Sequence, residues 1–124
     1  MPVMPRATSR KTRALPAPVP TPELLALVAR RFRVLADPVR LRILHAFGDE
    51  ELTVGQVIER TELPQATVSK HLQVLHAAGF LSRRKDGLFA YYELADEDVL
   101  RLCQMVCGRL ANEAAEVRKL FTIR

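Results

Sequence analysis

Apolar side chains recur every three or four residues over much of the chain, which is the spacing of one face of an α-helix. With capping residues at their starts and glycines after two of their ends, these segments predict five helices. We place the helices at residues 21–35, 37–48, 53–60, 65–78 and 96–120. Two starts are clear: Asp37 precedes Pro38, which is favoured at the first helical position, and Thr53 with Gln56 forms a capping box. Pro64 is expected to take that same first position in the fourth helix.

The period changes between the fourth and fifth helices. Residues 80–84 and 88–94 alternate between apolar and polar, and they flank Asp86-Gly87, a dipeptide typical of two-residue hairpin turns. Such a turn predicts an inward face of Leu81, Ala90, Tyr92 and Leu94, with Phe89 and Tyr91 more exposed. A loop one residue longer would reverse the faces, so the register stays open. The order of elements predicts a mainly α-helical fold with a small β-hairpin wing, a winged helix-turn-helix.

Length and composition divide the chain into a tail and one domain. Residues 1–20 hold five prolines and four basic side chains without an acidic one, which predicts a disordered tail. This tail is either without function or a basic arm that adds contacts to DNA. Residues 21–124 form the predicted DNA-binding and dimerisation domain, and a chain of only 124 residues gains further apolar burial by pairing with a second copy.

Charge is concentrated on the predicted helix-turn-helix. From Leu63 to Lys85 there is no acidic residue, whereas the preceding segment, residues 49–62, carries five acidic residues against one arginine. The four cations of the acid-free stretch are Lys70, Arg83, Arg84 and Lys85. This distribution favours one positive face that binds a polyanion, although a charge run can also be a merely solvated surface. For Arg40 and Arg42, contacts with the DNA backbone and ion pairs within the protein are equally open.

The fourth predicted helix has one apolar stripe, formed by Val68, Leu72 and Leu75, which should face the core. The polar side chains then turn toward solvent or a DNA groove: Gln65, Thr67, Ser69, Lys70 and Gln73. Glutamine pairs with adenine and lysine with guanine in the major groove, and hydroxyls bind several bases or phosphates. His71 could reach a phosphate or cap a neighbouring helix. The stretch Arg83–Lys85 would neutralise phosphates from the wing.

Several segments resemble the ArsR/SmtB family of prokaryotic transcriptional repressors. They are residues 32–44 (FRVLADPVRLRIL), 66–72 (ATVSKHL) with Leu75, 78–81 (AGFL), and 87–94 with its ending YYEL. The resemblance implies a homodimeric winged-helix repressor that leaves its operator on double-stranded DNA when an inducer binds. It also implies that Gln65, Ala66, Ser69 and Lys70 occupy the family's base-contacting positions.

The metal sites of that family do not transfer to this sequence. Arsenic-sensing and cadmium-sensing relatives carry a Cys-x-Cys unit where this chain has Leu52-Thr53-Val54-Gly55, which offers no sulfur ligand. Zinc-sensing relatives carry Asp and His ligands along the last helix, where this chain has Asp96 and Asp98 but no histidine after His76. We therefore predict no metal site of either kind.

Cys103 and Cys107 lie four residues apart on the last predicted helix. They are either small apolar residues packed in a dimer interface or a pair of sensing thiols. As a sensor they would take up a persulfide, another oxidised sulfur species or a thiophilic metal ion, or form a bond between subunits. Arg101 and Arg109 would favour thiolate, whereas apolar neighbours would oppose it, so the balance is open.

Three further alternatives follow from the same residues. The first is a winged-helix protein-interaction module without DNA binding, and the second is a constitutive repressor that senses no small molecule. The third, a thiol enzyme using Cys103, is disfavoured because no histidine base lies on that helix, so we predict no enzyme. Cysteines without CxxC spacing and the lack of a long apolar segment predict a cytoplasmic protein that does not bind membranes. The apolar stripe of the fifth predicted helix is longer than the small winged-helix body can cover, which predicts a homodimer that forms through the first and fifth helices.

Overall fold

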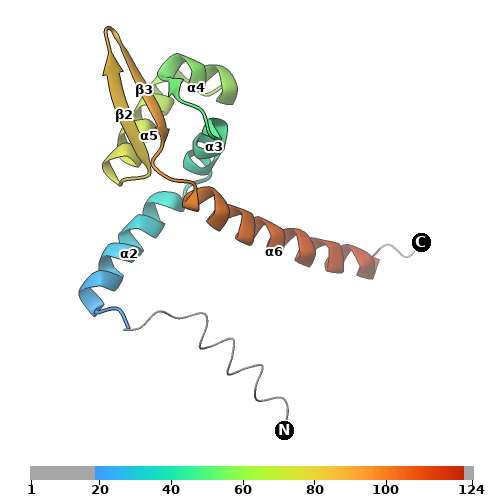
Figure 1. Ribbon diagram of the computed structural model, residues 1–124. Helices are drawn as coiled ribbons and strands as arrows, with labels where there is room; N and C mark the ends of the chain where they lie inside the picture. The colour runs from blue at the N-terminus through green and yellow to red at the C-terminus, as the bar shows by residue number, and fades with distance from the viewer. Residues whose placement is uncertain (1–18, 122–124) are drawn as a thin grey trace. The chain divides into compact units, whose positions relative to one another are not determined.

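The computed structural model describes residues 19–121 of the chain. The predicted tail therefore lies almost wholly outside the described residues. Within the described residues, chain contacts divide the chain between Arg31 and Phe32, and the part from Phe32 onward contains the winged helix-turn-helix. The elements, shown in Figure 1, are α2 (Pro22–Leu35), α3 (Pro38–Phe47), β1 (Leu52–Thr53), α4 (Val54–Thr61), α5 (Gln65–Ala77), β2 (Leu81–Asp86), β3 (Phe89–Leu94) and α6 (Asp98–Phe121). The five predicted helices are confirmed.

The helix starts follow from local capping chemistry. The Thr21 hydroxyl accepts a hydrogen bond from the backbone N–H of Leu24 at 3.2 Å. One carboxylate oxygen of Asp37 accepts from two N–H groups in the first turn of α3, at 2.8 and 3.2 Å. Thr53 and Gln56 form both bonds of the predicted capping box. These contacts satisfy N–H groups that have no partner inside their helix, which fixes where each helix begins.

Two other helix starts differ from the prediction. Pro64 is the N-cap of α5, with φ −62° and ψ 150°, and not its first helical residue. The two positions demand the same φ of proline, so the sequence alone does not separate them. Helix α6 begins at Asp98, two residues later than expected, because the Asp96 carboxylate remains outside the helix and accepts a hydrogen bond from the Asp98 N–H at 2.8 Å.

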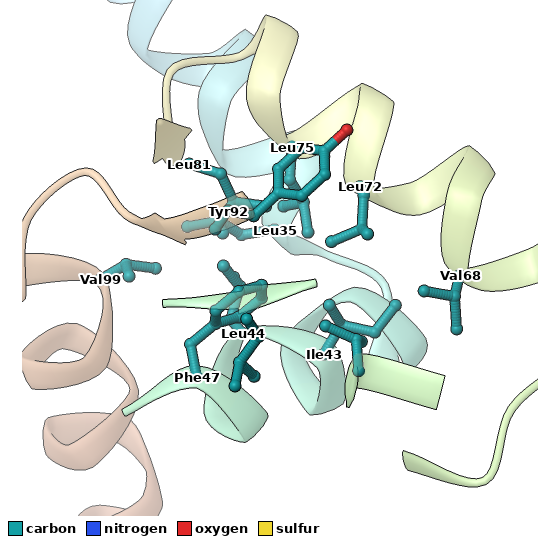
Figure 2. Close-up of a cluster of buried hydrophobic side chains, with 12 residues drawn as sticks. Leu35, Ile43, Leu44, Phe47, Val68, Leu72, Leu75, Leu81, Tyr92 and Val99 are labelled. Atoms are coloured by element: carbon teal, nitrogen blue, oxygen red, sulfur yellow. The ribbon is translucent and has the colours of Figure 1, made fainter. Parts of the chain in front are cut away.

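One hydrophobic core joins the helices to the sheet (Figure 2). The predicted stripe of α5 lies wholly inside it, with Val68, Leu72 and Leu75 at 0% exposure. The side chains that surround this stripe come from every other element: Leu35, Ile43, Leu44, Phe47, Leu52, Val57, Leu81, Tyr92 and Val99. Burial of this stripe fixes the rotation of α5 about its own axis and so decides which side chains the helix presents outward.

The wing is part of a three-stranded antiparallel sheet in the order β1-β3-β2. Asp86 pairs with Phe89, so the two-residue turn is Gly87-Leu88 and not the predicted Asp86-Gly87. Gly87 has a φ of +64°, the left-handed conformation that the first turn position of such hairpins requires. The predicted faces are retained, since Leu81 and Tyr92 are buried and Phe89 is exposed. The two-residue strand β1 was missed.

Candidate nucleic-acid interface

Helix α5 presents a polar and acid-free surface. With its apolar stripe in the core, the exposed side chains include Gln65, Ala66, Lys70 and Gln73, whereas Thr67 and Ser69 are half-buried. No acidic residue occurs in the helix, and no side chain caps the N–H groups of its first turn. A helix N-terminus with free N–H groups carries a partial positive charge that favours phosphate. The helix therefore combines hydrogen-bonding side chains with a surface suited to a polyanion.

His71 is placed differently from the other predicted contacts on α5. Its side chain is buried, and its Nδ1 accepts a hydrogen bond from Nε of Arg40 at 3.1 Å. The expected phosphate contact by His71 is therefore not supported, because the ring faces α3 and not the surface. Burial lowers the pKa of His71; the Arg40 and Lys70 charges also lower it, whereas the Asp37 carboxylate opposes them.

The arginines at the start of α3 hold other parts of the domain. Arg40 also donates to the carbonyl of Val34 at 3.1 Å, and Arg42 donates to the carbonyl of Thr61 at the end of α4. The Thr61 hydroxyl donates to the Val57 carbonyl at 2.7 Å. Of the two alternatives left open for Arg40 and Arg42, the structure favours contacts within the protein, though these contacts are hydrogen bonds and not ion pairs. Arg42 fastens α3 to the end of α4, and Arg40 fastens α3 to His71 of α5 and to Val34 of α2.

The three basic residues of the wing are not equivalent. All are exposed, but Arg83 and Lys85 pair across the hairpin with Tyr92 and Ala90, whereas Arg84 pairs with Tyr91 on the opposite face. Arg84 binds the Glu51 carboxylate through Nε at 2.8 Å and Nη2 at 2.9 Å. This pairing lowers the pKa of Glu51 and raises that of Arg84. No local pattern signals this pair, because Glu51 stands in a separate acidic stretch 33 residues away in the chain.

Helix α6 holds both cysteines. Cys103 is half-buried and Cys107 is exposed. Burial raises the pKa of the Cys103 thiol, and the neighbouring Cys107 raises it further. Arg101 binds Asp98 at 2.9 Å and Glu97 at 3.3 Å, so its charge is already paired with carboxylates. Of the opposing effects left open by the sequence, burial prevails at Cys103, which disfavours the reactive thiolate.

The outer part of α6 is apolar and uncovered within one chain. Only Val99 at its start belongs to the buried core, with Leu100 and Leu102 packed against that core. Large apolar side chains further along are more than half exposed: Met105, Val106, Leu110, Val117 and Leu120. Exposed apolar side chains gathered along one helix are typical of a surface that another protein chain covers.

Residues 19–121 offer neither a cluster of metal ligands nor a membrane-spanning helix. That part of the chain contains no group of three or more His, Cys, Asp or Glu side chains suited to a metal ion. It also contains no helix that is both long and apolar enough to cross a membrane.

Comparison with known proteins identifies the family. A family described as "Helix-turn-helix domain" matches residues 35–84. The regulator KmtR of Mycobacterium tuberculosis is 36% identical over 87 residues, which cover 70% of this chain and 66% of that protein. A transcriptional repressor SmtB homolog of Synechocystis is 33% identical over 94 residues, covering 72% and 71%. The chain belongs to the ArsR/SmtB family. Its members are helix-turn-helix regulators of transcription.

Solved structures agree with this assignment. The homodimeric winged helix-turn-helix DNA-binding domain of a regulator from Mycobacterium bovis is 36% identical, with a TM-score of 0.63 over 76% of this chain and 86% of that domain. The predicted fold class is thereby confirmed. The matched region spans slightly less than two thirds of the length of KmtR.

The lowered pKa of His71 makes stability depend on pH. Because the folded pKa lies below the free-histidine value of 6.5, the unfolded chain takes up the proton first as the pH falls. Stability is therefore full above pH 6.5 and declines as the pH falls below it. Urea denaturation between about pH 7.5 and 5.5 should show this decline in the wild type and a weaker one in His71→Gln. His45→Gln, which removes an exposed imidazole, is the control; an equal decline in all three proteins would contradict the assignment.

Proposed function

We propose that this protein is a homodimeric repressor that binds a specific inverted-repeat operator by inserting α5 into the major groove. The observation that carries the proposal is the orientation of α5: its whole apolar stripe is buried, so its acid-free polar surface faces outward. The major groove admits a helix and presents hydrogen-bonding base edges, which a protein reads with side chains of this kind.

Base reading is assigned to the side chains near the N-terminus of α5. Gln65 and Lys70 are exposed and carry the donors and acceptors that adenine and guanine recognise. The hydroxyls of Thr67 and Ser69 and the amide of Gln73 add contacts to bases or phosphates, whereas Ala66 offers only a methyl group for thymine. From the wing, Arg83 and Lys85 neutralise phosphates and position the domain without reading sequence.

The dimer is proposed to form through α2 and α6, because a second copy would cover the exposed apolar surface of α6. A two-fold axis relates the two α5 helices and matches an inverted repeat whose half-sites lie about 34–36 Å apart.

Release from the operator is proposed to follow modification of Cys103 and Cys107 by a persulfide or another oxidised sulfur species, or binding of a thiophilic ion. These are the only cysteines of the chain, and they lie on the helix assigned to the dimer interface. A constitutive repressor is the second candidate, and the raised pKa of Cys103 favours it, because a protonated thiol reacts slowly.

Substitution of Gln65 or Lys70 by Ala should relax sequence preference. The loss of discrimination is expected to be about 1–3 kcal/mol for each base contact removed. Affinity is measured by mobility shift on a duplex from the protein's own upstream region and on a random duplex of equal length. Gln104→Ala, a change of an exposed glutamine on α6, is the control. Undiminished discrimination in both α5 variants would show that α5 does not read the bases.

Leu110→Glu should separate the dimer. The variant places an unpaired charge in the proposed interface, which an apolar partner surface cannot solvate. Sedimentation at matched concentration should give the mass of a monomer. Far-UV circular dichroism should give the helix content of the wild type. Ala115→Glu, an exposed position on another side of α6, should remain dimeric. A folded dimer of the Leu110 variant would place the interface elsewhere.

The thiol proposal predicts that a Cys103→Ser, Cys107→Ser double variant binds operator like the reduced wild type but ignores polysulfide, oxidant and thiophilic ions. The wild type should lose affinity under at least one of these treatments, because a modified or ligand-bound thiol alters packing between subunits. Mobility shifts with and without each reagent give the comparison. A wild type whose affinity never changes would assign both cysteines to packing alone, and any inducer would then bind elsewhere.

A further inference from the structure

Arg84 is the one wing cation with partners on nearly every side. Nε and Nη2 bind the two oxygens of Glu51, the side-by-side geometry in which guanidinium binds carboxylate most strongly. Nη1 lies 3.6 Å from a carboxylate oxygen of Asp86. The guanidinium carbon lies 4.5 Å from the centroid of the Tyr91 ring, which covers one of its faces. A phosphate would have to compete with Glu51 for Nε and Nη2.

The sheet register explains this arrangement. Arg84, Tyr91 and Thr53 form one row across the three strands, and Glu51 precedes Thr53 by two residues, so it falls on the same face. The neighbouring row contains Arg83, Tyr92 and Leu52, of which Tyr92 and Leu52 are buried in the core. Arg84 therefore extends from the face of the sheet opposite the core, whereas Arg83 and Lys85 extend from the face that α5 packs against.

Apart from the contacts of Arg84, few contacts fix the orientation of the outer hairpin relative to the core. Residues 82–89 are all exposed, so apolar burial holds β2 only at Leu81. The bond from Arg84 to Glu51 attaches this exposed segment to the residue just before β1. Among residues 19–121, by contrast, Arg83 and Lys85 have no ion-pair partner.

We propose that Arg84 is a positioning residue: its bonds to Glu51 and its stacking on Tyr91 hold the wing in the direction from which Arg83 and Lys85 reach phosphates. This inference rests on the proposed DNA binding and adds a division of roles within the basic run. A wing that is ordered before binding loses less conformational entropy on the DNA, so the pair raises affinity without itself contacting the duplex.

Four variants test the proposal. Glu51→Gln removes the carboxylate, and Glu50→Gln makes the same change of charge at a residue that pairs with Arg60 of α4. Arg84→Lys keeps the charge but cannot form the two-bond pairing. Arg83→Ala removes a proposed phosphate contact. For each protein we would measure affinity for duplex DNA as a function of salt, and amide hydrogen exchange of residues 82–89 without DNA.

The expected pattern separates positioning from direct contact. Relative to Glu50→Gln, Glu51→Gln should bind DNA about two- to five-fold more weakly, the effect of an exposed ion pair of good geometry. Arg84→Lys should show a similar loss relative to the wild type. Both should exchange faster over residues 82–89 while keeping the wild-type salt slope. Arg83→Ala should reduce that slope by about 0.9, as the loss of one phosphate contact requires.

Two results would overturn the proposal. Tighter binding by Glu51→Gln than by Glu50→Gln would mean that Glu51 masks Arg84 from a phosphate. Unchanged hydrogen exchange of the wing in both Glu51→Gln and Arg84→Lys would mean that the pair positions nothing. Failure of the wild type to bind any duplex would refute the proposed function separately, and the exchange experiment would still decide whether Glu51 and Arg84 hold the wing.

Discussion

Burial of the α5 stripe is the interaction on which the rest of the structure depends. Val68, Leu72 and Leu75 are wholly enclosed by side chains of the other helices and the sheet. Removing such a side chain costs about 2–5 kcal/mol for leucine, a large part of the stability of a small domain. The same contacts set the rotation of α5, so the stability of the fold and the exposure of its polar surface have one cause. The wing is tied to that core through Leu81 and Tyr92.

Partly buried hydrogen bonds between the helices add defined geometry to this apolar packing. Arg40 donates to His71 on α5 and to the carbonyl of Val34, while Arg42 donates to the carbonyl of Thr61 beside the turn that precedes α5. Apolar contacts tolerate small rotations, whereas hydrogen bonds demand defined distances and angles. Arg40 thus links α3 to α5, and Arg42 links α3 to the end of α4. Both arginines therefore contribute contacts within the helix-turn-helix.

Local features were predictable from the sequence because they depend on neighbouring residues. The caps by Asp37 and Thr53, and the stripe of α5, follow from side chains within one or two helical turns. The turn at Gly87-Leu88 was predicted one residue early, because Asp86 and Gly87 together resemble a common turn pair and only strand pairing shows that Asp86 belongs to β2. A two-residue strand such as β1 has no alternation to detect.

The candidate site was predictable only in part. The outward side chains of α5 follow from helical period, but the partners of His71 and Arg84 stand 31 and 33 residues away in the chain. No local pattern signals such pairs, so the sequence leaves His71 open between a phosphate contact and a helix cap and does not distinguish Arg84 from the other two wing cations. The proposed role of α6 in a dimer depends on a second chain, which a single sequence does not supply.

The most direct test of the account is an NMR titration of the ¹⁵N-labelled protein with a duplex that it selects from a random pool. If α5 reads the bases, the largest specific shifts should fall on residues 65–73, with smaller shifts at Arg83 and Lys85 that a random duplex also produces. Little change is expected in the outer part of α6. Equal shifts on α5 with selected and random duplexes, or specific shifts confined to another element, would contradict the claim that the buried stripe of α5 exposes a base-reading surface.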